Sequence, residues 1–307
     1  MSEAFIRVRV LGAAAGGGLP QWNCGCANCR DARLERIPAL TQSSVAIRDY
    51  RGAWHLVNAS PDLRIQIGAC SDLQPGLAVL RGTPISGVLL TNADLDHVLG
   101  LLSLREGGRL HVYATSAVRE TLSESLGLTA ILDSFCGVEW HERPQADFAP
   151  LIGMDGEESS LSYRAIELPG GPPVFARSRR HDGAHSVAYQ FMDRNTGGRL
   201  LVAPDVGGWS DALRAAMHES DAVLFDGTFW SGDELLRVKA KAPMAREMGH
   251  LTIRDDTLAV LGKLPAPHKI YVHINNTNPV LSPGSPERAE VAAAGIVVGY
   301  DGLEFEI

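Results

Sequence analysis

A buried strand that leads straight into acidic and imidazole side chains is the feature that most constrains this chain. The apolar run 85–90 is typical of a core strand and is followed by Asp94, Asp96 and His97. The apolar-periodic run 98–104 predicts a helix that begins at His97, so the carboxylates lie in a strand-to-helix turn. Carboxylates in such a turn either cap free backbone N–H groups or bind a metal. This segment alone leaves both interpretations open.

Further predicted strands also end in side chains that bind metals. The strands 199–203, 222–225 and 268–272 are followed by Asp205, Asp226 and His273. A single residue of this kind is usually a turn former or a helix cap, and for Asp226 taken alone a turn and an active-site contact are equally good interpretations. Four such strands in one chain indicate that one edge of a sheet gathers ligands around a common cleft.

The remaining pattern alternates strands with helices, which is typical of an α/β architecture. Additional strands are predicted at 5–11, 44–47, 54–57, 110–114 and 185–191. Helices are predicted at 116–126, 210–218 and 252–264, with a further short one that ends at Ile67. The acidic and polar stretch 153–160 is interpreted as a surface loop.

The composition is that of an ordinary globular protein. The chain has 307 residues, of which 45% are hydrophobic and 21% are charged, which fits one large domain or two tightly packed halves. A net charge of −8 offers no basic face for nucleic acid. No apolar run reaches about 18 residues, so no membrane insertion is expected. The first residues lack the basic and apolar regions of a signal peptide, and a cytoplasmic location is expected.

Three of the five cysteines lie within six residues, at Cys24, Cys26 and Cys29. In a reducing compartment such spacing favours metal-bound thiolates over disulfides. Three closely spaced thiolates are typical of a four-coordinate structural zinc site, whose fourth ligand must come from elsewhere. We therefore expect a cysteine-rich zinc loop at about residues 20–30. Cys70 and Cys136 stand alone and are interpreted as ordinary thiols.

A glycine-rich loop at 12–20 follows the first predicted strand. Such loops often bind phosphate, but no Gly-Lys-Ser/Thr follows here. Pro20 and the cysteines also occupy the place where a phosphate-binding helix would begin. We therefore expect these glycines to let the backbone pass close to other groups, including those of an active site.

The polar segment and the later residues resemble a known family pattern. Members of the metallo-β-lactamase superfamily carry the motif HxHxDH after a strand, followed by a further His, an Asp and a final His. The corresponding residues here are Asn92, Asp94, Asp96 and His97, then His185, Asp205 and His273. The segments 16–26 and 273–279 closely resemble a family of pyrroloquinoline quinone (PQQ) biosynthesis proteins within this superfamily, and the resemblance covers about residues 5–307.

The resemblance implies a four-layer αββα sandwich, with residues 1–307 as a single domain and metals at one edge of the two sheets. The first metal site of the superfamily is expected to be weak or empty. Asn92 and Asp94 replace two of its histidines, so that only His185 remains. An Asp of relatives is also replaced, by Asn58, which changes the hydrogen bonds around the ligands.

The second metal site keeps its ligands in this resemblance. Asp96, His97 and His273 are its predicted ligands, and Asp205 stands at the position that bridges two metals in relatives. Two imidazoles and one carboxylate with open positions form the ligand set of non-haem Fe(II) oxygenases, whereas two-zinc hydrolases need histidines at both sites. We therefore expect Fe(II) at the active site and structural Zn²⁺ at the cysteines.

The PQQ family makes a redox cofactor from a Glu-Tyr crosslink excised from a precursor peptide. The resemblance therefore implies hydroxylation of the tyrosine ring of this small precursor with Fe(II) and O₂. Asp94, His185 and His250 are predicted to orient the substrate or to move protons. The predicted substrate contacts are Asn92, Asn276 and Trp22. Related phosphodiesterases have a zinc-binding His at position 276, so the Asn here leaves the fourth zinc ligand open.

Two alternative functions remain open at this point. The first is a non-enzymatic carrier that transports PQQ or its precursor. The second is a metal-dependent hydrolase that resembles the phosphodiesterases and requires a second metal. Other PQQ biosynthesis proteins are further candidate partners, and the oligomeric state is not readable from the sequence.

Overall fold

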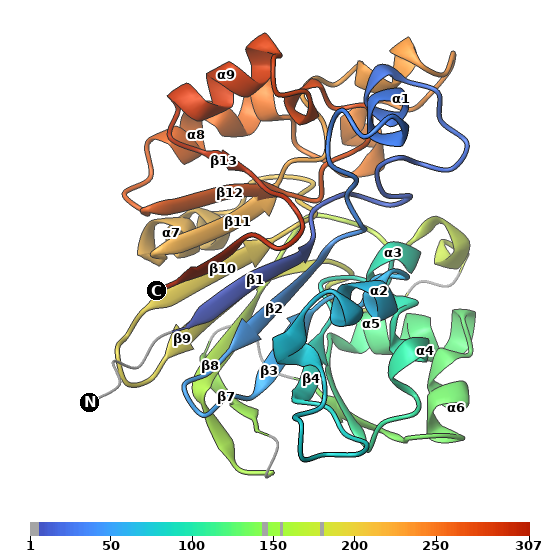
Figure 1. Ribbon diagram of the computed structural model, residues 1–307, viewed down its shortest axis with the longest axis vertical. Coiled ribbons are helices and arrows are strands. Elements are labelled where there is room, and N and C mark those ends of the chain that lie inside the picture. Colours follow the sequence, from blue (N-terminus) through green and yellow to red (C-terminus); the bar gives the residue numbers. More distant parts are fainter. Residues whose placement is uncertain (1–5, 143–146, 154–155, 179–180) are drawn as a thin grey trace.

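Two seven-stranded sheets form the centre of the computed structural model, which describes residues 6–142, 147–153, 156–178 and 181–307 (Figure 1). The first sheet has the order β14 (Glu304–Glu306), β1 (Arg7–Gly12), β2 (Ser44–Arg48), β3 (Trp54–Val57), β4 (Ile85–Leu89), β5 (Leu110–Tyr113) and β6 (Val138–His141). The second has the order β13 (Val297–Val298), β12 (His268–Val272), β11 (Ala222–Asp226), β10 (Arg199–Ala203), β9 (Val187–Asp193), β8 (Glu158–Glu167) and β7 (Ala149–Ile152).

Helices cover the outer faces of both sheets (Figure 1). The first sheet is covered by α2 (Leu63–Gly68), α3 (Leu95–Val98), α4 (Leu101–Leu104), α5 (Ser116–Glu120) and α6 (Leu128–Asp133). The second is covered by α7 (Asp211–Glu219), α8 (Leu258–Gly262) and α9 (Pro286–Ala293), and α1 (Ala27–Arg33) lies beyond the end of β1. The predicted four-layer αββα sandwich is therefore confirmed.

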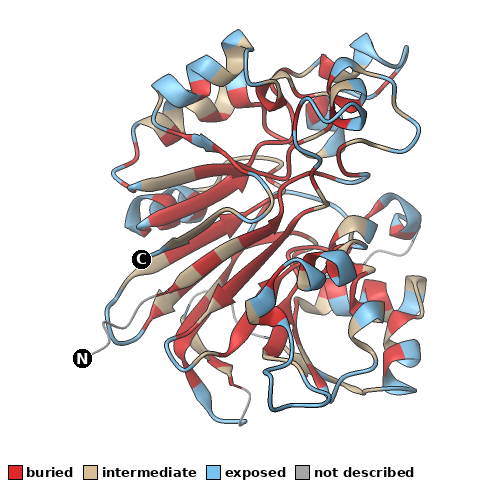
Figure 2. Ribbon diagram, viewed as in Figure 1, coloured by how far each residue is buried: buried red, intermediate tan, exposed pale blue. Residues whose placement is uncertain are grey.

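Two apolar clusters hold the layers together. The larger one joins side chains of both sheets, such as Val10 and Phe191, to Met217 of α7. The smaller one joins Val88 of β4 to Val98 of α3 and other helix residues on the outer face of the first sheet. Figure 2 shows most strands buried along most of their length, as expected for strands covered on both faces. No helix within the described parts of the chain is both long enough and apolar enough to cross a membrane.

Strand direction brings the predicted polar residues to one edge. Strands β10, β11 and β12 pair in parallel, and β3, β4, β5 and β6 pair in parallel in the other sheet. The carboxyl ends of parallel strands meet at the same edge, so the residues that follow β4, β10, β11 and β12 gather there.

The helix predicted to begin at His97 begins earlier in the structure and is interrupted. It begins at Leu95 as α3, breaks at Leu99 and Gly100, and resumes as the short α4. The amide of Gly100 donates to the carbonyl of Ala59 at 2.8 Å. A Cβ at position 100 would lie 2.2 Å from the carbonyl oxygen of Ser60, so only glycine allows this close approach of two backbones.

Other element predictions also need correction. The helix predicted at 116–126 consists of α5 followed by a π-helical turn, Thr121–Ser125, and the one predicted at 252–264 begins with the π-helical turn Ile253–Thr257. The predicted loop 153–160 is wrong at its end, because Glu158 to Ser160 belong to β8. Ser159 is buried there and donates to Asp49 at 2.7 Å, so a polar residue fills an interior strand position. Residues 154–155 of that prediction lie outside the described residues.

We predict that Gly100→Ala lowers the free energy of unfolding by about 1–3 kcal/mol, because the added methyl group must push two backbone segments apart. Urea denaturation monitored by circular dichroism measures this change. The matched control is Gly108→Ala, where an added Cβ meets nothing within 4 Å. Equal stability of the two variants would contradict the close approach at Gly100.

Candidate metal centre

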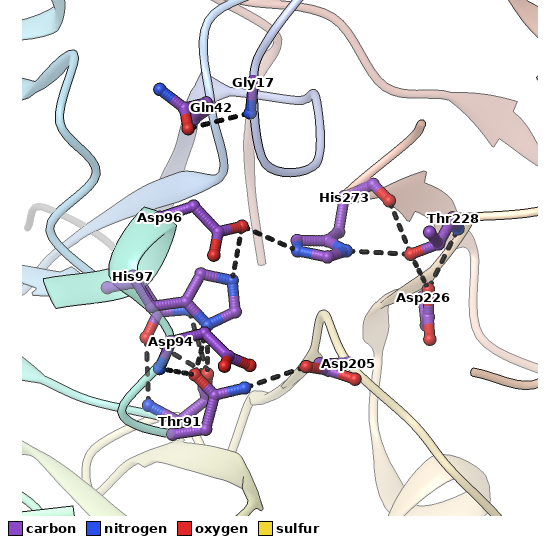
Figure 3. A network of polar contacts seen from close by, with 12 residues as sticks. Gly17, Gln42, Thr91, Asp94, Asp96, His97, Asp205, Asp226, Thr228 and His273 are labelled. Carbon is purple, nitrogen blue, oxygen red and sulfur yellow. Dashed lines mark hydrogen bonds and ion pairs between the residues drawn. The ribbon is translucent and has the colours of Figure 1, made fainter. Parts of the chain in front are cut away.

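Three side chains that bind metals meet at the edge of the two sheets. Asp96 and His97 come from α3 and His273 follows β12, as Figure 3 shows. An oxygen of Asp96 lies 3.3 Å from Nε2 of His273 and 3.8 Å from Nε2 of His97. Ligand atoms bound to one metal at about 2.0–2.2 Å lie about 3.0–3.5 Å apart. The three atoms are therefore close to the spacing that a single ion requires.

The ring of His97 is held so that its metal-binding nitrogen is free. Its Nδ1 lies 2.7 Å from Oδ1 of Asn92, and the amide nitrogen of Asn92 donates to Asp205 at 2.8 Å. A carboxylate only accepts hydrogen bonds, so the amide oxygen must face His97 and accept its Nδ1 proton. Nε2 of His97 is then an unprotonated acceptor, and it is buried without a hydrogen-bond partner among the described residues. This unsatisfied atom fits a metal ligand.

The ring of His273 is oriented by a chain of two polar residues. The hydroxyl of Thr228 lies 2.6 Å from Asp226 and 2.8 Å from Nδ1 of His273. Because the hydroxyl donates to the carboxylate, it accepts from Nδ1 and leaves Nε2 of His273 directed at Asp96. His273 adopts a left-handed backbone conformation, with φ of 55°, which few residues other than glycine adopt. Sequence reasoning did not identify Thr228 as part of this site.

The charges of the three groups favour a cation. Burial raises the pKa of Asp96, but the neighbouring His97 and His273 outweigh this effect, and the pKa lies well below its usual range. Burial lowers the pKa of His97. Burial also opposes protonation of His273, but Asp96 outweighs it and raises the pKa of that ring. A metal ion would therefore find a carboxylate and a neutral imidazole, and would displace the proton from His273.

A second group of polar residues surrounds the ligands. His250 donates from Nδ1 to Asp226 at 2.8 Å and lies 3.4 Å from Asp205. Burial lowers the pKa of His250, but the two carboxylates raise it to about 10 overall. The pKa of Asp94 is also raised, to about 7, because burial and the charges of Asp205 and Asp96 oppose its ionisation.

A pocket of about 560 Å³ opens beside this group. Asn92, Asp94 and Asp205 line it, as do Arg177 and Arg246, the latter from the 3-10 helix Ala245–Met248. The pocket thus has the polar lining expected of a small-molecule site next to the candidate metal ligands.

Three further predicted residues have contacts or exposure that involve none of the three candidate ligands. Nε2 of His185 faces the carbonyl of His181 at 3.2 Å, and His185 is not among the clustered metal-binding side chains of the described residues. The side chain of Trp22 is 86% exposed. Asn276 is buried, and its side chain contacts the cysteines.

The glycine-rich loop at residues 12–20 passes close to one of the candidate metal ligands. A Cβ at Gly16 would lie 3.2 Å from an oxygen of Asp96, so the backbone passes close to a candidate ligand. The expectation that these glycines let the backbone pass close to other groups is confirmed at Gly16. Gly17 also donates to Gln42, which ties the loop to the segment before β2 (Figure 3).

The three clustered cysteines lie at the start of α1, against the loop that follows β12. The side-chain nitrogen of Asn276 lies 3.2 Å from the sulfurs of Cys24 and Cys29 and 3.5 Å from that of Cys26. Burial raises the pKa of Cys26 to about 11, so a cation is needed to hold all three sulfurs as thiolates. Asn28 donates to the carbonyl of Asn276 at 2.9 Å and fixes the two segments together.

We predict that Asn92→Ala weakens binding of a divalent metal by about 10–100-fold, because His97 loses the acceptor that fixes its tautomer. Competition with a chromogenic chelator measures the dissociation constant. Asn195→Ala, in the exposed turn between β9 and β10, is the matched control and leaves the affinity unchanged. Unchanged affinity in Asn92→Ala would contradict the orientation derived for His97.

Comparison with known proteins reveals a family match over most of the chain. The model of the β-lactamase superfamily domain matches residues 53–274. Coenzyme PQQ synthesis protein B of Cupriavidus taiwanensis is 42% identical over 98% of this chain and 99% of its own length. The protein of the same name from Pseudomonas paraeruginosa is 40% identical over 98% of this chain and all of its own length.

Solved structures agree with this match. The crystal structure of Zn²⁺-bound PqqB from Methylobacterium extorquens superposes with a TM-score of 0.87 at 35% identity, covering 98% of this chain and 100% of that chain. A diphosphatase of the PhnP family superposes with a TM-score of 0.69 at 20% identity, covering 99% of this chain and 97% of that chain, and shares the fold. The chain therefore belongs to the coenzyme PQQ synthesis protein B family of the β-lactamase superfamily.

Proposed function

We propose that this protein takes part in PQQ biosynthesis and hydroxylates the tyrosine ring of the Glu-Tyr-derived precursor with O₂. One oxygen atom of O₂ enters the ring as a hydroxyl group, and two electrons from an external reductant, with two protons, convert the other to water. The names of the relatives support the pathway. The observation that carries the reaction is the set Asp96, His97 and His273, two imidazoles and one carboxylate gathered around one point. Fe(II) in such a set keeps open positions at which O₂ and a substrate can react.

The residues at the neighbouring positions support a single metal. Both ends of the Asn92 side chain are already engaged, by His97 and by Asp205. Asp94 stands at a position where the superfamily motif HxHxDH has a histidine, and His185 faces a backbone carbonyl. A paired-zinc hydrolase of the superfamily pattern has histidines at both metal sites, so this arrangement favours oxidative chemistry over hydrolysis.

Asp94 and His250 have distinct tasks in this proposal. Asp94 lines the pocket, and its pKa of about 7 suits a base that accepts the phenolic proton of the substrate near neutral pH. His250 stays protonated between Asp226 and Asp205, so it holds those carboxylates in place and offers positive charge to an anionic substrate. Asp205 serves as a further metal ligand or as a hydrogen-bond acceptor, and His185 orients the substrate.

Two basic residues of the pocket suit the proposed substrate. A Glu-Tyr crosslinked diamino acid carries several carboxylates, and Arg177 and Arg246 line the pocket, although Arg246 also pairs with Asp256. Asn92 is oriented to support His97, and Asn276 to contact the sulfurs, so substrate contacts by these two residues and by Trp22 stay predictions. We place the reaction in the cytoplasm, alongside other PQQ biosynthesis proteins.

We predict that His97→Ala abolishes hydroxylation and weakens Fe(II) binding by a factor on the order of 100 or more, because a first ligand is lost. Anaerobic iron loading, followed by O₂ consumption and mass spectrometry of the Glu-Tyr compound, measures both effects. His218→Ala, on the exposed face of α7, is the control. Retained hydroxylation in His97→Ala would rule out this ligand set.

Tight PQQ binding without O₂ consumption by the unmodified protein would favour the carrier, and phosphodiester cleavage with added zinc would favour the hydrolase.

We further propose that Cys24, Cys26 and Cys29 hold a structural Zn²⁺ in a loop at about residues 20–30 of a single domain. The side-chain amide of Asn276 faces all three sulfurs, at the corner that a fourth ligand would occupy. Rotation of this amide by half a turn would present its oxygen to the ion. The ion would then link α1 to the loop that carries His273.

We predict that Cys29→Ser removes about one equivalent of zinc and lowers the thermal midpoint by roughly 5 °C or more, because in a domain of this size each kcal/mol of lost stability is worth about 2–4 °C. Elemental analysis and calorimetry measure the two effects. Cys136→Ser is the matched control, because that thiol stands apart from the cluster. Equal zinc content in both variants would contradict the structural site.

A further inference from the structure

A third group of metal-binding side chains lies on the first sheet, apart from both sites above. His111 is on β5, and Glu139 and His141 are on β6, the last strand of the sheet. The two strands pair in parallel with His111 opposite Glu139 and Tyr113 opposite His141. Opposite residues share a face, and residues two apart on one strand share it as well. The register therefore places all three side chains on the same side of the sheet.

This side of the sheet faces the second sheet. The hydroxyl of Tyr113, two residues after His111, accepts from the amide of Ile152 on β7 at 2.9 Å. His55 lies in the same row of the first sheet, through Gly87, and contacts the carbonyl of Ile152 at 3.0 Å. The group thus lies at the edge of the sandwich where β6 and β7 are the last strands of their sheets, and its side chains are 14–47% exposed.

The distances within the group match one small ion. Nδ1 of His111 lies 2.9 Å from Nε2 of His141 and 3.9 Å from Oε2 of Glu139, and Nε2 of His141 lies 3.9 Å from the other carboxylate oxygen, Oε1. Ligands bound tetrahedrally at about 2.0 Å are about 3.3 Å apart. Each of the three separations differs from this value by about 0.6 Å or less. The side chain of Glu139 is 47% exposed and is free to make this adjustment.

The two rings are also oriented for a shared ion. Two imidazole nitrogens that face each other at hydrogen-bond distance must share one proton, and a metal ion replaces that proton by using both lone pairs. Tyr113 stacks on His141 with ring centroids 4.5 Å apart and an angle of 18° between planes, which fixes the ring. Burial lowers the pKa of the nearby His55 to about 4, so it adds no positive charge beside the ion.

We propose that His111, Glu139 and His141 form a binding site for a transition-metal ion such as Zn²⁺, separate from the catalytic centre and from the cysteines. Two imidazoles and one carboxylate select Zn²⁺, Ni²⁺ or Cu²⁺ over Mg²⁺ and Ca²⁺, which prefer oxygen ligands. The fourth position is open to water. The site shares no residue with Asp96, His97 and His273, so it does not rest on the proposed hydroxylation.

Zinc titration of the protein with its own metals in place tests the proposal. Histidine-labelled protein is titrated with ZnCl₂ while the imidazole Cε1–H signals are followed by NMR, and bound zinc is counted after dialysis. The signals of His111 and His141 are expected to shift together, and the wild-type protein is expected to retain one more zinc equivalent than His141→Gln. His218→Gln, an exposed histidine on α7, is the control and retains the wild-type count.

A second variant covers the case in which His141→Gln fails to fold. Glu139→Gln changes only an exposed side chain and is expected to weaken this site by about 10–100-fold, with the other zinc equivalents unchanged. Unmoved His111 and His141 signals at saturating zinc would overturn the proposal. Equal zinc affinity in the wild-type protein and in Glu139→Gln would overturn the assignment of Glu139 as a metal ligand.

Discussion

A fully buried carboxylate, Asp226, fixes the positions of the residues that the second sheet contributes to the metal centre. It accepts hydrogen bonds from the amides of Val206 and Thr228, from the hydroxyl of Thr228 and from His250. Burial of a charge is costly unless donors of this kind surround it. Because these donors come from segments that follow β10 and β11 and precede α8, one anion fixes three loops. It also fixes His273 indirectly, through Thr228.

The first sheet contributes to the same edge through amides instead of carboxylates. Asn58, in a left-handed conformation after β3, binds both the amide and the hydroxyl of Thr91. Thr91 in turn lies 3.3 Å from the ring of His97. Asn92 then spans the gap between the sheets by reaching Asp205. The centre is therefore assembled from two halves whose fit depends on side-chain hydrogen bonds that cross the sandwich.

Much of this arrangement was predictable from the sequence, because strong patterns are local. The strands 54–57, 199–203 and 268–272 were predicted with the bounds that the structure has, since each is rich in apolar side chains. The break after α3 was not, because it depends on Gly100 meeting a backbone some 40 residues earlier in the chain. Strand β8 was not predicted, and its first residues were assigned to a loop, because Ser159 and Ser160 are polar residues in buried positions. Hydrophobic patterns cannot reveal strands of this kind.

The candidate ligands were named from their positions after strands and from the family resemblance, but their orientations were not predictable. The tautomer of His97 depends on Asn92, whose own orientation depends on Asp205, 113 residues later. Thr228 acts on His273 across 45 residues. The place of Asn276 among the sulfurs likewise joins residues about 250 positions apart. Such contacts exist only in the folded chain.

The loop after β12 carries His273 at its start and Asn276 against the cysteine sulfurs. Oxidation of those sulfurs would release Asn276 and loosen the loop, so an oxidant could silence the metal centre without reacting with any of its ligands. For a protein proposed to handle O₂, the durability of the active site then depends on how well a distant group of thiols is protected.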